Sequence, residues 1–204
     1  MEKIQVPGWD AITQVFEAQY PGQNDPVHYA PVISYRFGGP DPLDGISIYD
    51  GGEFYHFITY GFSELYEKES ENTEWSGFGF ELTLRLKKSG IRKRDREQKN
   101  ICGILQTLAR MTFEKGDIFM PEEYIYTGQQ TGIDADGTSS ITGFITMADA
   151  LGEIATPNGK VQLVQLVGAT DAELCALIDK KQSVHELLTQ IPGGLTDYQR
   201  NSLI

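Results

Sequence analysis

Cysteine, histidine and long apolar runs are scarce in this chain of 204 residues. Its two cysteines, Cys102 and Cys175, lie far apart in apolar, helix-like surroundings. This predicts buried reduced thiols and argues against a disulfide framework or a zinc site. The three histidines, His28, His56 and His185, show no metal-ligand spacing, so we expect structural or surface roles for them. No apolar run is long enough to cross a bilayer and no apolar signal region opens the chain, so a cytoplasmic protein is expected.

Positive charge is also in short supply, because the formal net charge is −12. Phosphate backbones and anionic membranes repel such a chain on average, so neither nucleic acid nor membrane is expected as a partner. The one basic run extends from Lys87 to Asn100, and within it Arg92 to Lys99 is the candidate for nucleic-acid binding. Asp95 and Glu97 interrupt the run, which contains no aromatic residue. We favour a solvated approach to a helix, with a patch for an acidic protein partner as the alternative.

Catalytic and cofactor signatures are incomplete in this sequence. Asp134 to Thr138 resembles the start of a calcium loop, but its glycine comes too early and no glutamate closes it, so a turn is expected. Gly77 to Phe80 lacks the third glycine of a dinucleotide fingerprint, and a strand follows where a helix is required. Glu64 and Glu81 could form an acid/base pair only if they converged, and solvated carboxylates are the favoured interpretation. These patterns predict no enzyme, no cofactor and no metal.

An enzyme remains the alternative function. It would be a hydrolase or a metal-dependent enzyme whose site is assembled from scattered polar residues: His28, His56, Glu64 and Asp117. This alternative requires the four side chains to converge in one concave pocket with perturbed pKa values.

Apolar spacing and turn residues predict an α+β fold. Helices should pack on a largely antiparallel or mixed sheet, in a single domain over residues 1–204. Helices are predicted over residues 9–20 and 101–111, and capping boxes at Thr170 and Ser183 predict two more. Strands are predicted over residues 32–37, 46–49, 54–60, 80–86, 118–126, 141–147 and 161–167, with Gly168 ending the last. A hairpin through Asp50-Gly51-Gly52 should join the second and third of these, while residues 63–71 fit a short helix or a turn.

The strand over residues 80–86 has the clearest alternation. Its apolar side chains point to one face and its polar side chains to the other: Phe80, Leu82, Leu84 and Leu86 against Glu81, Thr83 and Arg85. This pattern predicts a sheet with one buried side and one polar side.

Three long, aromatic-rich motifs stand out: GGPDPLDGISIY at 38–49, TYGFSELYEK at 59–68 and SGFGFELTLRLK at 76–87. They closely resemble the amino-terminal domain of the suppressor of fused family, and the resemblance extends from Gly8–Ile12 to Leu195–Arg200. In animals, members of that family bind Gli-type zinc-finger transcription factors, and a peptide of the factor adds as a strand between two domains. Tight turns and aromatic strands also suit a demanding core, so both a contact surface and a core stay open for these motifs.

The resemblance covers only the first of those two domains, and so points to short, stand-alone bacterial members. Some of these are proposed as immunity proteins that neutralise toxins. It implies a non-enzymatic protein-binding domain whose partner is a toxin or a regulatory protein. An aspartate that helps to hold the peptide in the animal proteins matches Asp117, so Asp117, Ile118 and Phe119 are the predicted partner-binding residues. A tyrosine used there falls at Met111, which lacks the hydroxyl.

Overall fold

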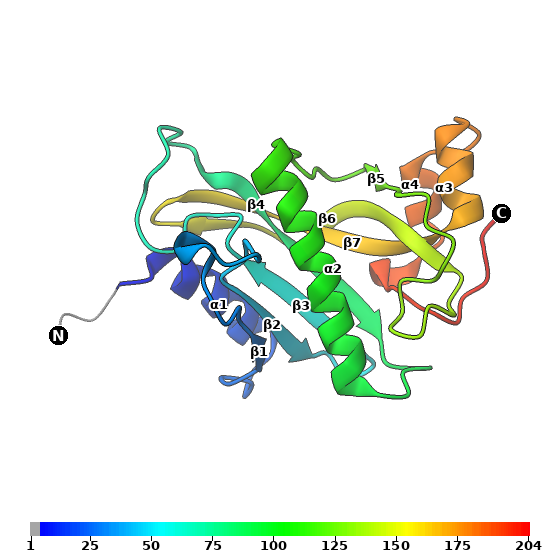
Figure 1. Ribbon diagram of the computed structural model, residues 1–204, viewed down its shortest axis with the longest axis horizontal. Helices are drawn as coiled ribbons and strands as arrows, with labels where there is room; N and C mark the ends of the chain where they lie inside the picture. Colours follow the sequence, from blue (N-terminus) through cyan, green and yellow to red (C-terminus); the bar gives the residue numbers. More distant parts are fainter. Residues whose placement is uncertain (1–4) are drawn as a thin grey trace.

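One mixed seven-stranded sheet lies at the centre of the computed structural model, which describes residues 5–204 (Figure 1). The strand order is β1-β2-β3-β4-β7-β6-β5, and only the β4–β7 pair is parallel among the described strands. The strands are β1 (Val27–Tyr29), β2 (Gly45–Asp50), β3 (Phe54–Tyr60), β4 (Trp75–Lys87), β5 (Tyr124–Ile125), β6 (Ile141–Thr156) and β7 (Gly159–Thr170). The helices are α1 (Pro7–Gln19), α2 (Arg94–Lys115), α3 (Asp171–Ile178) and α4 (Val184–Leu188), with short 3-10 turns η1 (Tyr35–Phe37) and η2 (Pro192–Gly194). The predicted α+β class is confirmed.

Local sequence signals account for several of these elements. The predicted hairpin joins β2 and β3, whose registers pair Gly45 with Tyr60 and Asp50 with Tyr55. Both predicted capping boxes are present, at Thr170 before α3 and at Ser183 before α4. No helix among residues 5–204 is long and apolar enough to cross a membrane.

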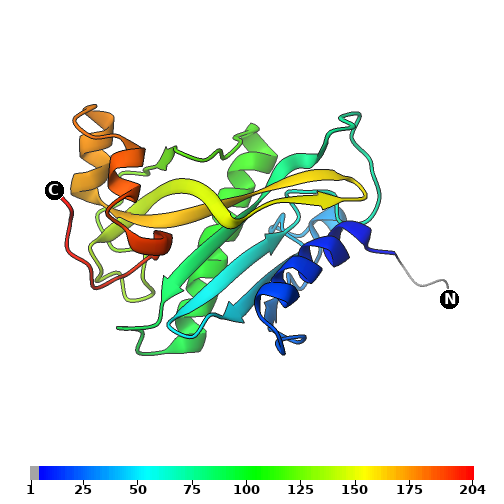
Figure 2. The same cartoon turned by 180° about the vertical axis from the view of Figure 1, so that it is seen from behind.

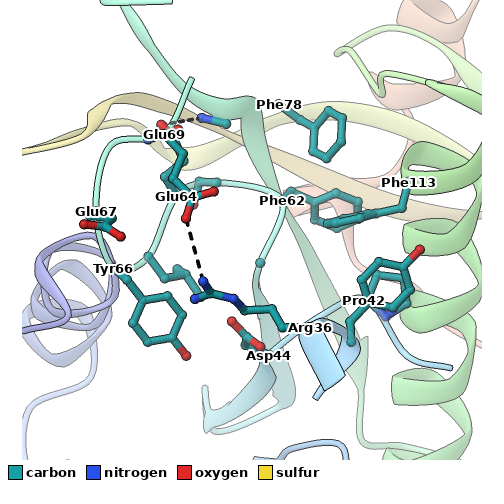
Figure 3. Close-up of a pocket in the computed structure, with 15 residues that line it drawn as sticks. Arg36, Pro42, Asp44, Phe62, Glu64, Tyr66, Glu67, Glu69, Phe78 and Phe113 are labelled. Carbon is teal, nitrogen blue, oxygen red and sulfur yellow. Dashed lines mark hydrogen bonds and ion pairs between the residues drawn. The ribbon is translucent and has the colours of Figure 1, made fainter. Parts of the chain in front are cut away.

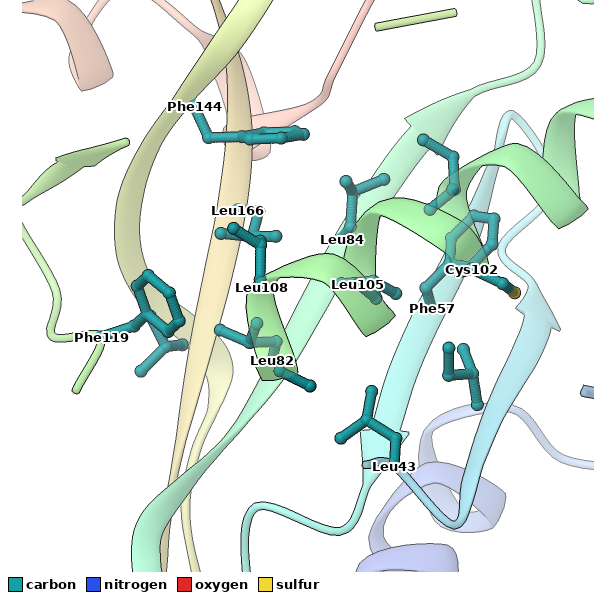
Figure 4. Packing of buried hydrophobic residues seen from close by; sticks show 14 of the residues in the cluster. Leu43, Phe57, Leu82, Leu84, Cys102, Leu105, Leu108, Phe119, Phe144 and Leu166 are labelled. Atoms are coloured by element: carbon teal, nitrogen blue, oxygen red, sulfur yellow. The ribbon is translucent and has the colours of Figure 1, made fainter. Parts of the chain in front are cut away.

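Helices cover both faces of the sheet. On one face, α2 lies across β2, β3 and β4, where Leu105 and Leu108 pack among Phe57, Leu82 and Leu84 (Figure 4). On the opposite face, α1 covers the sheet, as seen from behind in Figure 2. The buried side chains of α1 and of Tyr20, which follows it, meet strand residues from β2, β3, β6 and β7: Ile12, Phe16 and Tyr20 against Tyr49, Ile58, Tyr60, Ile154 and Val161. The sheet is therefore buried on two sides.

The predicted division of β4 into an apolar and a polar side is confirmed, but the expectation that only one of the two sides is buried is wrong. Glu81 and Thr83 are both fully buried. Alternation along β4 correctly divides its side chains between two faces, but it carries no information on what covers each face. Here the polar face lies under other parts of the chain. Glu81 bonds to Thr59 and Ser63, and Thr83 bonds to Asp149.

Three further predictions need correction. Residues 32–37 form a loop and the turn η1 instead of a strand, because the Ser34 carbonyl accepts the backbone N–H groups of Phe37 and Gly39. The strand predicted over 118–126 is reduced to β5. For residues 63–71, where a short helix or a turn is expected, the structure has bends and no helix, which fits the turn. Strand β7 continues past Gly168 to Thr170, since the missing Cβ leaves room for the Thr196 side chain beside it.

The two cysteines differ in their surroundings. Cys102 is buried in the main core, as predicted, and burial raises the pKa of its thiol to about 12. Cys175 is exposed, because it lies on the outer side of α3, so the prediction of a buried thiol is wrong there.

Candidate partner-binding surface

The three sequence motifs converge on a groove of about 300 Å³ beside the carboxyl-terminal end of α2 (Figure 3). The first motif supplies Pro42 and Asp44, the second the loop from Phe62 to Glu67, and the third Gly77 and Phe78. The turn η1 and the last turns of α2 complete the walls. This groove places segments that are far apart in sequence around one surface.

An aromatic cluster forms one wall of the groove. The Phe113 ring of α2 lies 5.0 Å from Phe78, 5.5 Å from Tyr35 and 6.4 Å from Phe62, measured between ring centroids. The pairs with Phe78 and Tyr35 are edge-to-face, a favoured aromatic geometry. Phe62 is buried, whereas Phe78 and Tyr35 remain partly exposed to solvent. The wall can therefore receive an apolar group without rearranging the core.

Glu64 organises the acidic loop on the opposite side of the groove. Its carboxylate accepts hydrogen bonds from the backbone N–H groups of Glu69, Ser70 and Gly77 and from the Lys68 ammonium. Burial acts to raise the pKa of Glu64, but these hydrogen bonds outweigh it and lower the pKa to about 2. The prediction of a solvated carboxylate is therefore wrong for Glu64, which fixes the loop.

Glu81 has a similar structural role beneath the groove. Its carboxylate accepts the Thr59 hydroxyl at 2.6 Å, the Gly61 N–H at 3.0 Å, and both the N–H and the hydroxyl of Ser63. Complete burial raises the pKa of Glu81 to about 7, although these hydrogen bonds oppose the shift. The prediction of a solvated carboxylate is wrong here too. The second and third motifs are thus joined inside the fold as well as along the groove.

His56 belongs to a buried polar network on the α1 side of the sheet. Its Nδ1 lies 2.7 Å from the Tyr20 hydroxyl and its Nε2 lies 3.1 Å from Asp149 Oδ2. Asp149 also accepts hydrogen bonds from Thr83 and Arg85. Burial lowers the pKa of His56, although the neighbouring Asp149 acts to raise it. Burial acts to raise the pKa of Asp149, but its hydrogen bonds and the charges beside it outweigh this effect and lower the pKa to about 2. Both side chains are fully buried, so this network stabilises the fold and is closed to a substrate.

The four residues of the enzyme alternative are not assembled into a site. His28 lies on β1 with its Nδ1 3.0 Å from Ser47 Oγ, Glu64 ties a loop, His56 is buried, and Asp117 is exposed after α2. No hydrogen bond or ion pair joins any two of the four. Across residues 5–204, no group of three or more histidine, cysteine or acidic side chains could hold a metal ion.

The predicted partner-binding segment follows the end of α2. Asp117 and Ile118 are exposed, whereas Phe119 is buried and packs edge-to-face on Phe80 with a centroid distance of 6.0 Å. The segment forms no strand of its own. Within the described part of the chain, the backbone groups of residues 117–119 make no hydrogen bond.

The basic run is divided between a loop and α2, and much of its charge is paired. Lys87 contacts Asp197 at 2.7 Å, and ion pairs also join Lys88 to Asp50 and Arg96 to Asp136. These contacts join the basic run to acidic residues elsewhere in the chain, which agrees with the favoured solvated approach to a helix.

Comparisons with known proteins agree with this arrangement. The family described as "Suppressor of fused protein" matches residues 39–201, which include nearly all of the three motifs. The chain belongs to the suppressor of fused family. The human and mouse suppressor of fused homologs are each 30% identical to it, over 91% of this chain but only 41% of their own length. The suppressor of fused family is a family of protein-binding regulators.

Solved suppressor of fused structures have the same fold. The structure described as "the Sufu-Fu complex" matches with a TM-score of 0.80 and 29% identity, covering 97% of this chain and 92% of that one. Drosophila Suppressor of Fused matches with a TM-score of 0.81 and 28% identity, covering 96% of this chain and 51% of that one. A putative homolog from Neisseria gonorrhoeae shares the fold at a TM-score of 0.59 and 16% identity, over 97% of both chains.

Sequence reasoning missed the groove and its aromatic wall. The sequence around Phe78 could have indicated its unusual position, because Phe78 lies between two glycines. Both adopt left-handed conformations, Gly77 at φ 55° and Gly79 at φ 87°. No sequence pattern indicates the contact between Tyr35 and Phe113, since it depends on how α2 crosses the sheet.

Proposed function

We propose that residues 1–204 act as one suppressor-of-fused-like domain that binds a protein partner and has no enzymatic activity. In this proposal the chain is a bacterial immunity protein that neutralises a toxin in the cytoplasm, without a metal, a cofactor, nucleic acid or a membrane. Membership in a family of protein-binding regulators supports the binding role. The bacterial setting rests on the resemblance to short bacterial members, and a Neisseria gonorrhoeae protein has the same fold.

The segment from Asp117 to Phe119 supports a binding site most directly. Phe119 anchors the segment in the core, so the exposed Asp117 and Ile118 are held in place. The unpaired backbone groups of this segment suit an extended peptide of the partner, which would add beside it through main-chain hydrogen bonds. Ile118 would supply an apolar contact and Asp117 a charged one.

Affinity capture from the native cells tests this proposal. The tagged protein is cross-linked, purified and analysed by mass spectrometry, and the same is done for Ile118→Asp. Ile178→Asp is the matched control, because Ile178 of α3 is 46% exposed and Ile118 is 43% exposed. We expect one stoichiometric partner that the native chain and Ile178→Asp retain and Ile118→Asp loses.

A growth assay then tests neutralisation. The captured partner is expressed with and without the native chain, and growth arrest should occur only without it. A partner that is harmless on its own would remove the immunity role. Capture that is unaffected by Ile118→Asp would remove the proposed site.

A further inference from the structure

The loop before the first motif displays apolar side chains that the fold does not use. Val32 is fully exposed, Phe37 is 84% exposed and Ile33 is 56% exposed. The backbone of this loop is closely packed, because the Ser34 carbonyl accepts two N–H groups and a Cβ at Gly39 would collide with the Ile33 carbonyl oxygen. The conformation of the loop therefore keeps these side chains exposed to solvent. An exposed apolar patch of this kind marks an interaction site.

The same loop also contributes to the wall of the aromatic groove. Tyr35 belongs to the same loop and contacts the Phe113 ring, and Phe113 in turn contacts Phe78. The register between β4 and β7 shifts between Trp75 and Phe80, so Phe78 lies in an irregular part of the strand. An irregularity of this kind re-aims a side chain. Here it leaves Phe78 partly exposed on the groove wall.

Charge around the groove has one predominant sign. Asp44, Glu67 and Glu69 line it, and Arg36 is the basic side chain on its wall (Figure 3). Arg36 lies 4.0 Å from Glu69, and both side chains are about two-thirds exposed, which makes this a weak contact. Lys68 is occupied elsewhere, because its ammonium binds Glu64 and the Trp75 carbonyl. An acidic rim beside an apolar wall attracts cations and repels phosphate and anionic membranes.

We infer that this groove docks a basic polypeptide segment of the protein partner. An aromatic or large aliphatic side chain of the segment enters against Phe78 and Phe113, while flanking lysine or arginine side chains face Asp44, Glu67 and Glu69. This inference rests on the proposed function, since it names the chemistry of the partner. It adds a second contact surface, separate from the segment at Asp117.

Synthetic peptides of about 12 residues test the inference, with a central tryptophan flanked by lysines as the probe. Two matched peptides replace the tryptophan by alanine or the lysines by glutamates. Binding to the full chain is measured by isothermal titration, and chemical-shift changes in NMR spectra locate the peptide. We expect the lysine–tryptophan peptide alone to bind, to shift the signals of Phe78 and its neighbours, and to weaken about tenfold between about 50 mM and 500 mM salt.

Variants of the chain make the test specific. Phe78→Ala and the double variant Glu67→Lys with Glu69→Lys should each weaken the peptide about tenfold or more. The charge-matched control, Asp25→Lys with Asp179→Lys, changes exposed residues elsewhere and should leave binding unchanged. Ile118→Asp should also leave it unchanged. The inference is overturned if the three peptides bind the native chain equally well. It is also overturned if the lysine–tryptophan peptide binds Phe78→Ala as tightly as it binds the native chain.

Other occupants of the groove appear as separate outcomes. Self-association in analytical ultracentrifugation that Phe78→Ala abolishes would assign the groove to a second copy and overturn the inference. Binding to anionic vesicles of phosphatidylglycerol that requires Phe37 would overturn it as well. If the captured partner needs Ile118 but not Phe78, the inference falls while the proposed function stands. If the chain captures no partner at all, the proposed function falls with it.

Discussion

Two hydrogen bonds join Glu81 to Ser63. Glu81 Oε1 accepts the Ser63 backbone N–H at 2.9 Å and the Ser63 hydroxyl at 2.6 Å. Glu81 lies in β4, and Ser63 lies in the loop that follows β3, directly before Glu64. This contact therefore fixes that loop against the sheet. The acidic rim of the groove therefore depends on a carboxyl group that is itself fully buried.

The burial of Glu81 predicts a specific dependence of stability on pH. Its pKa is raised from 4.5 to about 7, so between these values the folded state holds a proton that the unfolded state has released. The resulting stability is fully present below pH 4.5 and is lost as the pH rises through 7. Over this range we expect the free energy of unfolding to fall by about 3 kcal/mol relative to that of Glu81→Gln. Urea unfolding of both proteins across the range measures this, and a constant difference would contradict it.

The second prediction contrasts the effect of a glycine-to-alanine substitution at Gly77 and at Gly103. Gly77 has φ 55°, and a Cβ there would lie 2.7 Å from the Phe62 carbonyl oxygen, so Gly77→Ala should destabilise the protein by about 2 kcal/mol. Gly103 lies in α2 with open space around its Cβ position, so Gly103→Ala should stabilise it by about 0.5–1 kcal/mol. Urea unfolding measures both changes. Equal effects of the two substitutions would rule out the strained backbone at Gly77.

Local signals were sufficient to predict much of the fold. The capping boxes at Thr170 and Ser183 lie within four residues of the helices that they begin, and the β2–β3 hairpin depends on a turn between neighbouring strands. The strand error at 32–37 has the opposite cause. Its β-forming side chains favour a strand, but the hydrogen bonds of the Ser34 carbonyl set a turn that propensity alone does not reveal.

What the sequence could not reveal depends on distant contacts. Glu81 and His56 are evident in the sequence, but their burial depends on other segments. Glu81 is enclosed by Thr59 and by the loop from Gly61 to Ser63, and His56 contacts Asp149 in the bulge of β6. Part of the candidate surface came from a family resemblance, which supplied Asp117. The aromatic wall required Tyr35 and Phe113 to meet across the sheet, and no spacing in the sequence encodes that meeting.

Asp149 provides a third prediction. Its carboxylate accepts hydrogen bonds from Thr83 and Arg85 and lies beside His56, and its side chain is fully buried. Asp149→Ala would leave a mostly buried guanidinium without this partner, so we expect a loss of about 3–5 kcal/mol in the free energy of unfolding. The control is Asp179→Ala, which removes an exposed pair with Lys181 and should change stability by less than about 1 kcal/mol. Comparable losses in the two variants would show that the network contributes little.

The tautomer of His56 is the last prediction. Asp149 is an acceptor, so the neutral imidazole should carry its proton on Nε2, while Nδ1 accepts the Tyr20 hydroxyl. Burial lowers the pKa of His56 below 6.5, so the folded state excludes a proton that the unfolded state binds, and stability should fall as the pH drops below 6.5. Nitrogen-15 NMR of the ring measures the tautomer at neutral pH, with His56→Gln to assign the signals. A proton found on Nδ1, or on both nitrogens, would show that the network is arranged differently.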